Sequence, residues 1–236
     1  MRMPFELFVA LRYLFSRRKQ TFIYIISIMS ILGVALGVGA LVVVLGVYNG
    51  LTTDMRDKII GANAHGIVMS YVPAAFQQHP DLVRRVEAVE HVRGATPFIY
   101  TEVMLSAAGG VKGLVLRGID PESAPKVLSM LREIRRGSVT DLKREGTPGI
   151  VIGEELAKRL GIGLGSRVNL LSPSGEKGAT GYSPRIRPFE VVGIFKTGMF
   201  EYDATLAFVD LKAARDILGL PDGFLTGIEI MVDDVY

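Results

Sequence analysis

The sequence predicts an α+β protein: one N-terminal transmembrane helix followed by a mixed α/β domain that carries a projecting loop. Three observations predict this arrangement. Residues 20–53 hold no charged side chain, residues 54–236 alternate β-rich and helical segments, and residues 172–188 are dense in proline and glycine. The chain thus divides into a cytoplasmic or interfacial segment (1–19), a transmembrane helix (20–53) and an external domain (54–236).

The uncharged segment is long enough to cross a bilayer. As a helix its roughly 34 residues would extend about 50 Å, beyond the roughly 30 Å hydrocarbon core, so we expect it to tilt or to project. Arg17, Arg18 and Lys19 precede it, whereas the charges at 54–58 nearly cancel. The positive-inside rule therefore places the N-terminus in the cytoplasm and the main domain outside. A cleaved signal peptide is the competing reading, but its apolar region should span only about 7–15 residues.

Two features flank or interrupt this segment. Residues 4–14 place Phe5 and Phe8 near one helical face, which indicates a short helix on the inner leaflet. An N-terminal continuation of the spanning helix fits the same residues equally well. Within the span, Gly33 and Gly37 stand four apart, a spacing that lets another helix approach closely in lipid. Glycine is also common in membrane helices without such packing.

The external domain contains segments of both secondary-structure types. β-Branched and aromatic residues predict strands, and apolar residues at helical spacing predict helices between several of them. The expected strands are 65–70, 98–107, 113–118, 149–152, 167–171, 189–196, 205–209 and 226–232, and helices are expected to begin near Pro80, Pro121, Glu154 and Leu211.

Residues 172–188 depart from this pattern. Some 17 residues separate two expected strands, and loops beyond about 12–15 residues tend to be functional or disordered. Prolines at 173, 184 and 188 favour a stiffened shape over a floppy one, although a floppy insertion is the alternative. Tyr182, Arg185 and Arg187 belong to the residue types that dominate binding hot spots. We interpret the segment as a projecting arm for a protein partner.

The sequence offers little catalytic chemistry. It has no cysteine, and a net charge of +3 on scattered basic residues gives no footprint for nucleic acid. No phosphate-binding loop, zinc-protease motif or nucleophile elbow occurs. The glycines at 161, 163 and 165 follow an expected helix, so they indicate a helix stop. Glu154 and Glu155 fit a first helical turn, and the three histidines lack acidic partners at metal-ligand spacing. We therefore predict no catalytic residue and no metal site.

Short runs along the chain form a family pattern. They include Pro-Phe-Glu-Leu-Phe-Val-Ala-Leu-Arg-Tyr-Leu at 4–14, Ser-Arg-Arg at 16–18, Ile-Ser-Ile at 26–28, Gly-Val at 33–34, Val-Tyr-Asn-Gly at 47–50, Met-Arg-Asp-Lys-Ile-Ile at 55–60 and Ala-His at 64–65. Looser ones are Leu-Arg-Gly-Ile-Asp at 116–120, Gly-Ile-Val-Ile-Gly-Glu-Glu-Leu-Ala at 149–157 and Phe-Glu-Val-Val-Gly-Ile-Phe at 189–195. The first 65 residues closely resemble lipoprotein-releasing ABC transporter permeases (LolC/LolE type). The remainder is similar to the periplasmic core domain that these share with macrolide-exporter-like permeases.

The resemblance implies site residues in two places. Residues 172–188 would be a hook that holds a soluble carrier, with Pro173, Tyr182, Pro184, Arg185 and Arg187 as its carrier-binding residues. At the outer end of the membrane helix, the lipoprotein cavity would be lined by Val44, Val47, Tyr48 and Asn49. Tyr48 stands where the family often has Met, so contact assignments there are open. Lipid-facing or helix-packing roles suit the two valines equally well.

The resemblance also implies partners and a location. The chain would lie in the inner membrane of a Gram-negative bacterium and extract acylated lipoproteins for a periplasmic lipoprotein carrier. It would work with a cytoplasmic ATPase subunit, which holds ATP and Mg, and with a second permease subunit in a homo- or heterodimer. Membrane lipid surrounds the helix. No cofactor and no nucleic acid are expected on this chain.

One membrane helix cannot enclose a transport route. Family permeases carry three further helices and a coupling segment for the ATPase. We therefore expect this chain to be an N-terminal portion, with the substrate entrance and carrier dock but without the ATPase contact. Two alternatives stay open. One is a macrolide-exporter-type or division-associated permease of the same superfamily, and the other is a single-span membrane scaffold or sensor protein.

Overall fold

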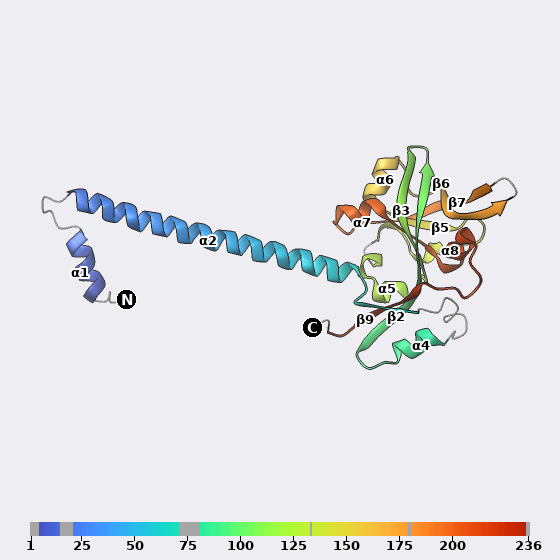
Figure 1. The fold of residues 1–236 in the computed structure, drawn as a ribbon, viewed down its shortest axis with the longest axis horizontal. Helices are drawn as coiled ribbons and strands as arrows, with labels where there is room; N and C mark the ends of the chain where they lie inside the picture. Colours follow the sequence, from blue (N-terminus) through green and yellow to red (C-terminus); the bar gives the residue numbers. More distant parts are fainter. Residues whose placement is uncertain (1–4, 15–20, 71–80, 133, 179–180, 235–236) are drawn as a thin grey trace. The chain divides into compact units, whose positions relative to one another are not determined.

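The computed structural model describes residues 5–14, 21–132, 134–178 and 181–234 apart from residues 71–80. It divides into two compact units, Met1–Arg56 and Asp57–Tyr236. The first unit contains helix α1 (Phe5–Leu14) and most of helix α2 (Thr21–Ala62). The second contains the sheet and the shorter helices (Figure 1).

Helix α2 has the length and composition of a membrane span. Its stretch Phe22–Arg56 has a mean hydropathy of 2.7, and none of it is buried against the protein. In the described part of the chain, this is the one helix long and apolar enough to cross a membrane. The helix continues past the expected end at residue 53 as far as Ala62, because arginine, lysine, isoleucine and methionine in this stretch tolerate helical geometry.

The second unit is built on a mixed sheet. The described strands are β1 (Gly66–Met69), β2 (Val92–Ala107), β3 (Gly110–Ile119), β4 (Ile134–Gly137), β5 (Gly149–Gly153), β6 (Arg167–Gly178), β7 (Gly181–Phe195), β8 (Leu206–Asp210) and β9 (Gly227–Val232). They are ordered β1-β9-β2-β3-β8-β5-β7-β4, and β6 pairs with both β2 and β7. Strands β2, β3, β8, β5, β7 and β6 therefore close into a ring, which we call the barrel.

The barrel encloses the main core. On β2, Val103 and Leu105 are buried while Met104 between them is half-exposed, as expected for a strand with one face inward. Strand β5 is buried along its whole length. Helices α6 (Glu154–Leu160) and α8 (Leu211–Leu218) add apolar side chains to the same core. The fold class predicted from the sequence, a long apolar helix followed by a mixed α/β domain, is confirmed.

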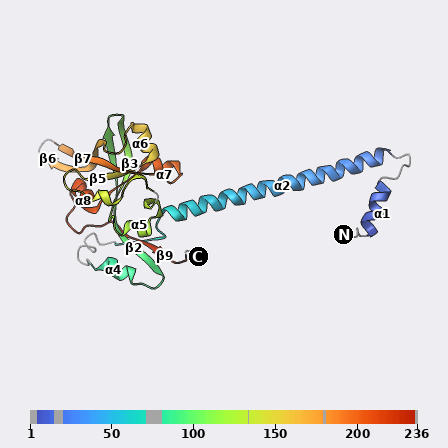
Figure 2. The same ribbon diagram turned by 180° about the vertical axis from the view of Figure 1, so that it is seen from behind.

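Short helices complete the unit, together with a small lobe formed by β1, β9, the first half of β2 and one of these helices, α4 (Leu82–Glu87) (Figure 2). The other short helices are α5 (Ala124–Val127), α7 (Phe200–Thr205) and the 3₁₀ turns η1 (Ser129–Leu131) and η2 (Thr140–Leu142). Strands β1 and β9 extend the sheet past the first half of β2, and helix α4 covers a small apolar cluster there. Between lobe and barrel, the buried Arg117 of β3 forms an ion pair with the buried Glu229 of β9.

Two local features compare directly with the sequence prediction. Gly161 ends α6 in the left-handed conformation (φ 63°), and Ile162 donates its N–H to Ala157 O at 3.0 Å, so the predicted helix stop is confirmed. The segment at 172–188 is a correction. The sequence predicts a loop here, but residues 172–178 and 181–188 belong to the paired strands β6 and β7. Because the arm strands pair only with each other there, each has a free edge, which is where a sheet tolerates proline.

Candidate functional site

A two-stranded arm formed by residues 172–178 of β6 and 181–188 of β7 projects from the barrel (Figure 1). The strands run in register from Arg167 opposite Glu190 up to Ser172 opposite Arg185. The pairing then shifts and resumes with Glu176 opposite Ser183, so a bulge interrupts the ladder. Such bulges bend a strand and increase its twist. The arm therefore has a root that continues the barrel sheet and an outer piece beyond the bulge.

The root of the arm has two different faces. Opposed residues in an antiparallel pair share one face, so Leu171 of β6 and Ile186 of β7 lie together on the outer face. Met104 of β2 is paired with Leu171, which extends the same apolar row onto the barrel wall. Ile186 and Met104 are both more than half exposed, at 56% and 52%. Because this exposed apolar row runs across three strands, we treat it as a candidate binding surface.

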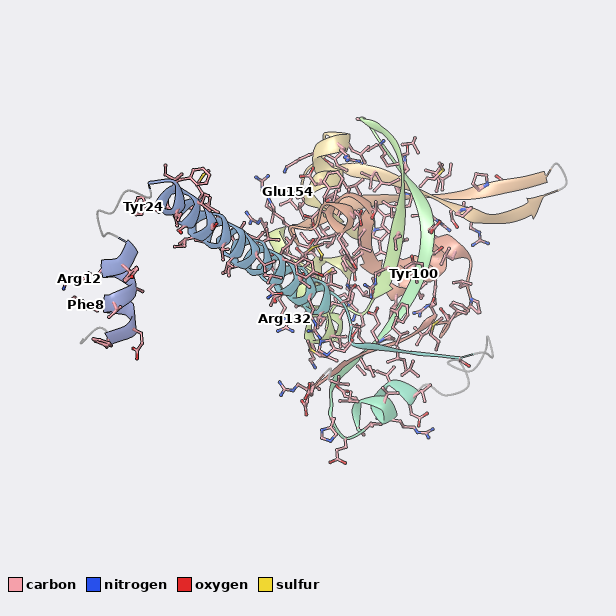
Figure 3. The ribbon with its side chains drawn as sticks, turned by 60° about the vertical axis from the view of Figure 1, so that its left-hand side comes forward. Phe8, Arg12, Tyr24, Tyr100, Arg132 and Glu154 are labelled. Atoms are coloured by element: carbon pink, nitrogen blue, oxygen red, sulfur yellow. The ribbon has the colours of Figure 1, made fainter. Side chains whose placement is uncertain are left out.

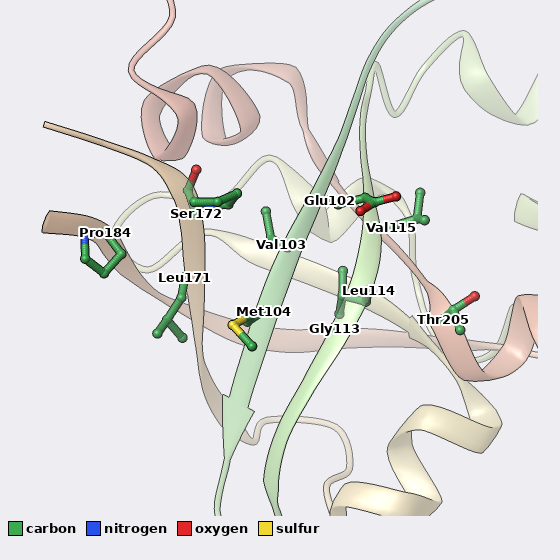
Figure 4. Close-up of a pocket in the computed structure, with 11 residues that line it drawn as sticks. Glu102, Val103, Met104, Gly113, Leu114, Val115, Leu171, Ser172, Pro184 and Thr205 are labelled. Carbon is green, nitrogen blue, oxygen red and sulfur yellow. The ribbon is translucent and has the colours of Figure 1, made fainter. Parts of the chain in front are cut away.

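A pocket of about 580 Å³ lies beside this apolar row (Figure 4). Its lining comes from five elements and consists of Glu102, Val103, Met104, Gly113, Leu114, Val115, Leu171, Ser172, Pro173, Pro184 and Thr205. Gly113, opposite Met104 in the ladder, leaves open space where a side chain would stand. Concave, mostly apolar sites of this size suit an apolar group of a partner.

The other face of the arm root carries two arginines. Arg185 is half-buried, and its guanidinium lies against Gly219, the residue that ends helix α8. Arg187 is exposed and lines a wider groove of about 1010 Å³. That groove also contains Asp210, Lys212 and Asp216, so it presents charges of both signs.

The structure brings together some of the predicted carrier-binding residues. Pro173 and Pro184 line one pocket, whereas Arg185 and Arg187 lie on the opposite face. Tyr182 belongs to strand β7 opposite Lys177, and its side chain lies outside the described residues. None of these assignments to a carrier is tested by the fold, and they stay predictions.

The sequence reasoning did not find Met104 and Gly113. They lie on strands about 70 and 60 residues before the arm, and only the closure of the barrel brings them to its root. One signal was available: within the strand 98–107, Met104 is an apolar residue on the phase that alternation assigns to solvent.

The residues predicted to line a lipoprotein cavity lie on α2. Val44, Val47 and Tyr48 are 63%, 66% and 63% exposed and share one helical face by their spacing. Asn49, the next residue, is also exposed. A side chain added at Gly33 or Gly37 would meet nothing within 4 Å, so both positions leave room for a neighbouring helix. The side chains of α2 project from the helix all around it (Figure 3).

Charged clusters elsewhere in the barrel have structural partners. Glu154, in the first turn of α6, lies 2.8 Å from Lys196 Nζ and 3.5 Å from Lys158 Nζ, and the hydrogen bond from Lys196 lowers its pKa. His65 Nδ1 lies 3.3 Å from the Val232 N–H donor. Within the described ranges, no three His, Asp or Glu side chains are grouped so that they could hold a metal ion.

Comparison with known proteins gives a consistent result. The model of the MacB-like periplasmic core domain matches residues 27–235. A protein of Neisseria meningitidis named lipoprotein-releasing system transmembrane protein LolC is 32% identical over 229 residues, which are 97% of this chain and 54% of that protein. A Xylella fastidiosa protein of the same name is 33% identical over 98% of this chain and 55% of its own length.

More distant relatives follow the same pattern. The Haemophilus influenzae protein named lipoprotein-releasing system transmembrane protein LolE is 25% identical over the whole of this chain and 56% of that protein. The chain therefore spans about half the length of the curated relatives it matches. The solved periplasmic region of MacB from Actinobacillus actinomycetemcomitans gives a TM-score of 0.45 at 14% identity, covering 72% of this chain and 74% of that one.

Proposed function

This chain belongs to the family of the MacB-like periplasmic core domain, and from that premise we propose that it is the N-terminal part of an ABC transporter permease that releases lipoproteins from the inner membrane. The names of its relatives in Neisseria and Xylella support lipoprotein release as the process. The observation that carries the proposal is the projecting arm, because its root offers an exposed apolar row and a pocket on which a soluble protein carrier could dock.

The chain is a membrane protein with a periplasmic domain. In our proposal the N-terminus is cytoplasmic, since Arg17, Arg18 and Lys19 precede the apolar helix and the positive-inside rule then applies. In our proposal ATP hydrolysis takes place on a separate ATPase subunit, as the names of the relatives and the family of the domain suggest. A second permease subunit packs on the face of α2 that carries Gly33 and Gly37, where small residues permit close approach.

The acylated lipoprotein enters beside the outer end of α2, where Val44, Val47 and Tyr48 offer an apolar face with Asn49 next to it. The soluble carrier docks on the outer face of the arm root. There Leu171, Ile186 and the two prolines Pro173 and Pro184 present an apolar surface with a pocket. A carrier that binds acyl chains has an apolar mouth, so an apolar docking surface matches its chemistry.

Site-specific photocrosslinking in cells tests this assignment. A photoreactive residue at Tyr182 or Ile186 should capture the soluble lipoprotein carrier, identified by mass spectrometry and confirmed with an antibody to it. The matched control is Arg135, an exposed residue of β4 away from the arm, and it should capture none. Capture of the carrier from both Arg135 and Ile186 in equal amounts, or from neither arm position, would contradict the proposal.

A second function is favoured by one observation, the match to the MacB-like periplasmic core domain. A macrolide-exporter-type or division-associated permease would use the same barrel without a carrier. A photoreactive residue at Tyr48 distinguishes the two, because it should trap acylated lipoprotein only in the first case. A single-span scaffold or sensor would trap no lipoprotein, and it would tolerate Gly33→Leu with Gly37→Leu at full cellular function.

A further inference from the structure

Arg185 touches a helix outside the arm. Its guanidinium occupies the space beside Gly219 so closely that a Cβ at Gly219 would overlap it. Gly219 ends α8 in the left-handed conformation, with φ at 67°. The C-terminal end of a helix carries partial negative charge and attracts a cation. Arg185 therefore has an electrostatic reason to reach across to α8 as well as a steric fit.

Helix α8 is a rigid reference for such a contact. Ala213, Ala214 and Ile217 are buried in the barrel core, and a Cβ at Gly118 of β3 would overlap the Ala214 Cβ. The helix therefore lies as close to the sheet as a glycine allows, and its end cannot shift without disturbing the core.

The position of Arg185 along the ladder matters as much as its contact. Arg185 and Ser172 form the last regular pair before the bulge, and Ser172 is fully buried. Beyond them the pairing shifts, so the outer piece of the arm is joined to the barrel through an irregular segment. A residue that anchors the strand just below such a segment controls the angle at which the segment begins.

We propose that Arg185 is a positioning residue of the arm: its guanidinium, seated against Gly219 at the end of α8, fixes the last regular strand pair below the bulge and so sets the direction in which the arm leaves the domain. This deepens the proposed function, on which its consequence for carrier docking rests. Arg185 then acts on the carrier through the arm, and the outer face with Pro173 and Pro184 makes the contact.

The first test measures the direction of the arm. The chain has no native cysteine, so Lys112→Cys on the barrel and Lys177→Cys on the arm provide one pair of spin labels in the full chain in lipid nanodiscs. Arg185→Ala should shift or broaden the distance distribution between the labels. Arg187→Ala, the exposed arginine on the same face, is the matched control and should leave it unchanged. A distribution for Arg185→Ala that coincides with the parent would overturn the proposal.

Two glycines provide a second test that separates the contact from backbone strain. Gly161 and Gly219 both end helices at nearly the same positive φ, 63° and 67°, but a Cβ at Gly161 would meet nothing within 4 Å. Alanine is strained equally at both positions. We expect Gly219→Ala to change the label distances and Gly161→Ala to leave them unchanged. In the Arg185→Ala background, Gly219→Ala should add no further change. Identical effects of the two glycine substitutions would contradict the role of Arg185.

Carrier capture from Ile186 completes the design. We expect Arg185→Ala to reduce capture several-fold and Arg187→Ala to reduce it less. Loss of capture in Arg185→Ala with unchanged label distances would make Arg185 a direct carrier contact and would overturn the positioning role. Absence of capture in the parent chain would count against the proposed function alone, because the distance measurements test the position of the arm without a carrier.

Discussion

Helix α2 and the barrel use the same apolar residue types in opposite ways. Leu36 of α2 is 72% exposed, whereas Leu116 of β3 is fully buried. In the barrel, apolar side chains leave water by packing on one another, which stabilises the fold by about 25 cal/mol per Å² buried. Helix α2 buries none of its apolar stretch within the described chain. Its apolar side chains therefore require an external apolar medium, and lipid supplies it.

The two regions also treat charge differently. The apolar stretch of α2 excludes charged side chains over residues 20–53, while the barrel accepts a buried pair, Arg117 with Glu229. Phe98 and Phe208 flank the guanidinium with ring centres 6.0 and 5.8 Å away. A protein interior can supply a counter-charge and aromatic faces at fixed positions, which lipid cannot do. Three predictions test this contrast.

The largest effect is expected from breaking the buried pair. Arg117→Ala leaves the Glu229 carboxylate buried without its partner, and such changes lower the free energy of unfolding by about 3–5 kcal/mol. Burial already raises the pKa of Glu229 above its ordinary 4.5, with Arg117 partly opposing the rise. The folded state therefore binds a proton at Glu229 more tightly than the unfolded state does. The stability of the variant should accordingly fall as pH rises from 4.5 through the raised pKa of Glu229.

Unfolding of the full chain in nanodiscs, followed by near-UV circular dichroism between pH 4 and pH 8, measures this. The control is a double replacement, Arg117→Met with Glu229→Met, which removes both charges and should recover most of the loss. If Arg117→Ala were as stable as the parent at pH 8, the ion pair would not contribute to the free energy of unfolding of the barrel.

The next effect comes from deleting the same side chain in both regions. Leu116→Ala leaves a cavity in the barrel core and should lower the free energy of unfolding of the domain by about 2–5 kcal/mol. Leu36→Ala shortens a side chain of α2 that is 72% exposed and should change the free energy of unfolding of the domain by less than about 0.5 kcal/mol. Thermal unfolding of the two variants side by side gives the comparison. Equal losses would mean that α2 contributes to the packing of the barrel.

The smallest effect belongs to a charge pair at the surface. Burial alone would raise the pKa of Asp120, but hydrogen bonds from Lys143 and Ser123 outweigh it, so the net pKa lies below 3.8. The pair with Lys143, at 2.9 Å, therefore stabilises the fold above pH 3.8, and this contribution is lost as pH falls through the lowered pKa.

Because the Lys143 side chain is 47% exposed, solvent screening limits the contribution to about 0.2–1 kcal/mol. Asp120→Asn should thus remove a small part of the acid sensitivity seen in unfolding curves between pH 6 and pH 3. Lys143→Met is the matched variant and should have the same effect. If Asp120→Asn lowered the free energy of unfolding as much as Arg117→Ala does, the expected difference between buried and surface ion pairs would be contradicted.

Local patterns predicted much of this fold. Alternation and β-branched residues located each of the eight expected strands to within a few residues at most of their ends, and apolar residues at helical spacing located helices α4, α5, α6 and α8. Strand β4 was missed because two of its four residues are arginines, and α7 because Phe200–Thr205 is too short to show a helical period. Closure of the barrel could not be predicted, since the pairing of Met104 with Leu171 is a long-range contact with no local signal.

The candidate site divides in the same way. The proline and arginine content of residues 172–188 predicted the arm. It also placed Pro173, Pro184, Arg185 and Arg187 in one predicted carrier-binding group. The alternation of a strand assigns the prolines to one face and the arginines to the other, but this holds only once the segment is known to be a strand. The contact of Arg185 with Gly219 depends on the tertiary position of α8. The sequence alone therefore gave no reason to distinguish Arg185 from Arg187.

The pairing of β1 with β9 has an engineering consequence. Gly66 lies opposite Ile230 and Met69 opposite Gly227, so the first and last described strands of the second unit lie side by side at one edge of its sheet. A domain with adjacent ends behaves as a cassette: it can be excised and its neighbours rejoined by a short linker, or it can be grafted into a surface turn of an unrelated host. The same geometry would permit arms from different relatives to be exchanged as whole barrels, with the splice points confined to two neighbouring strands.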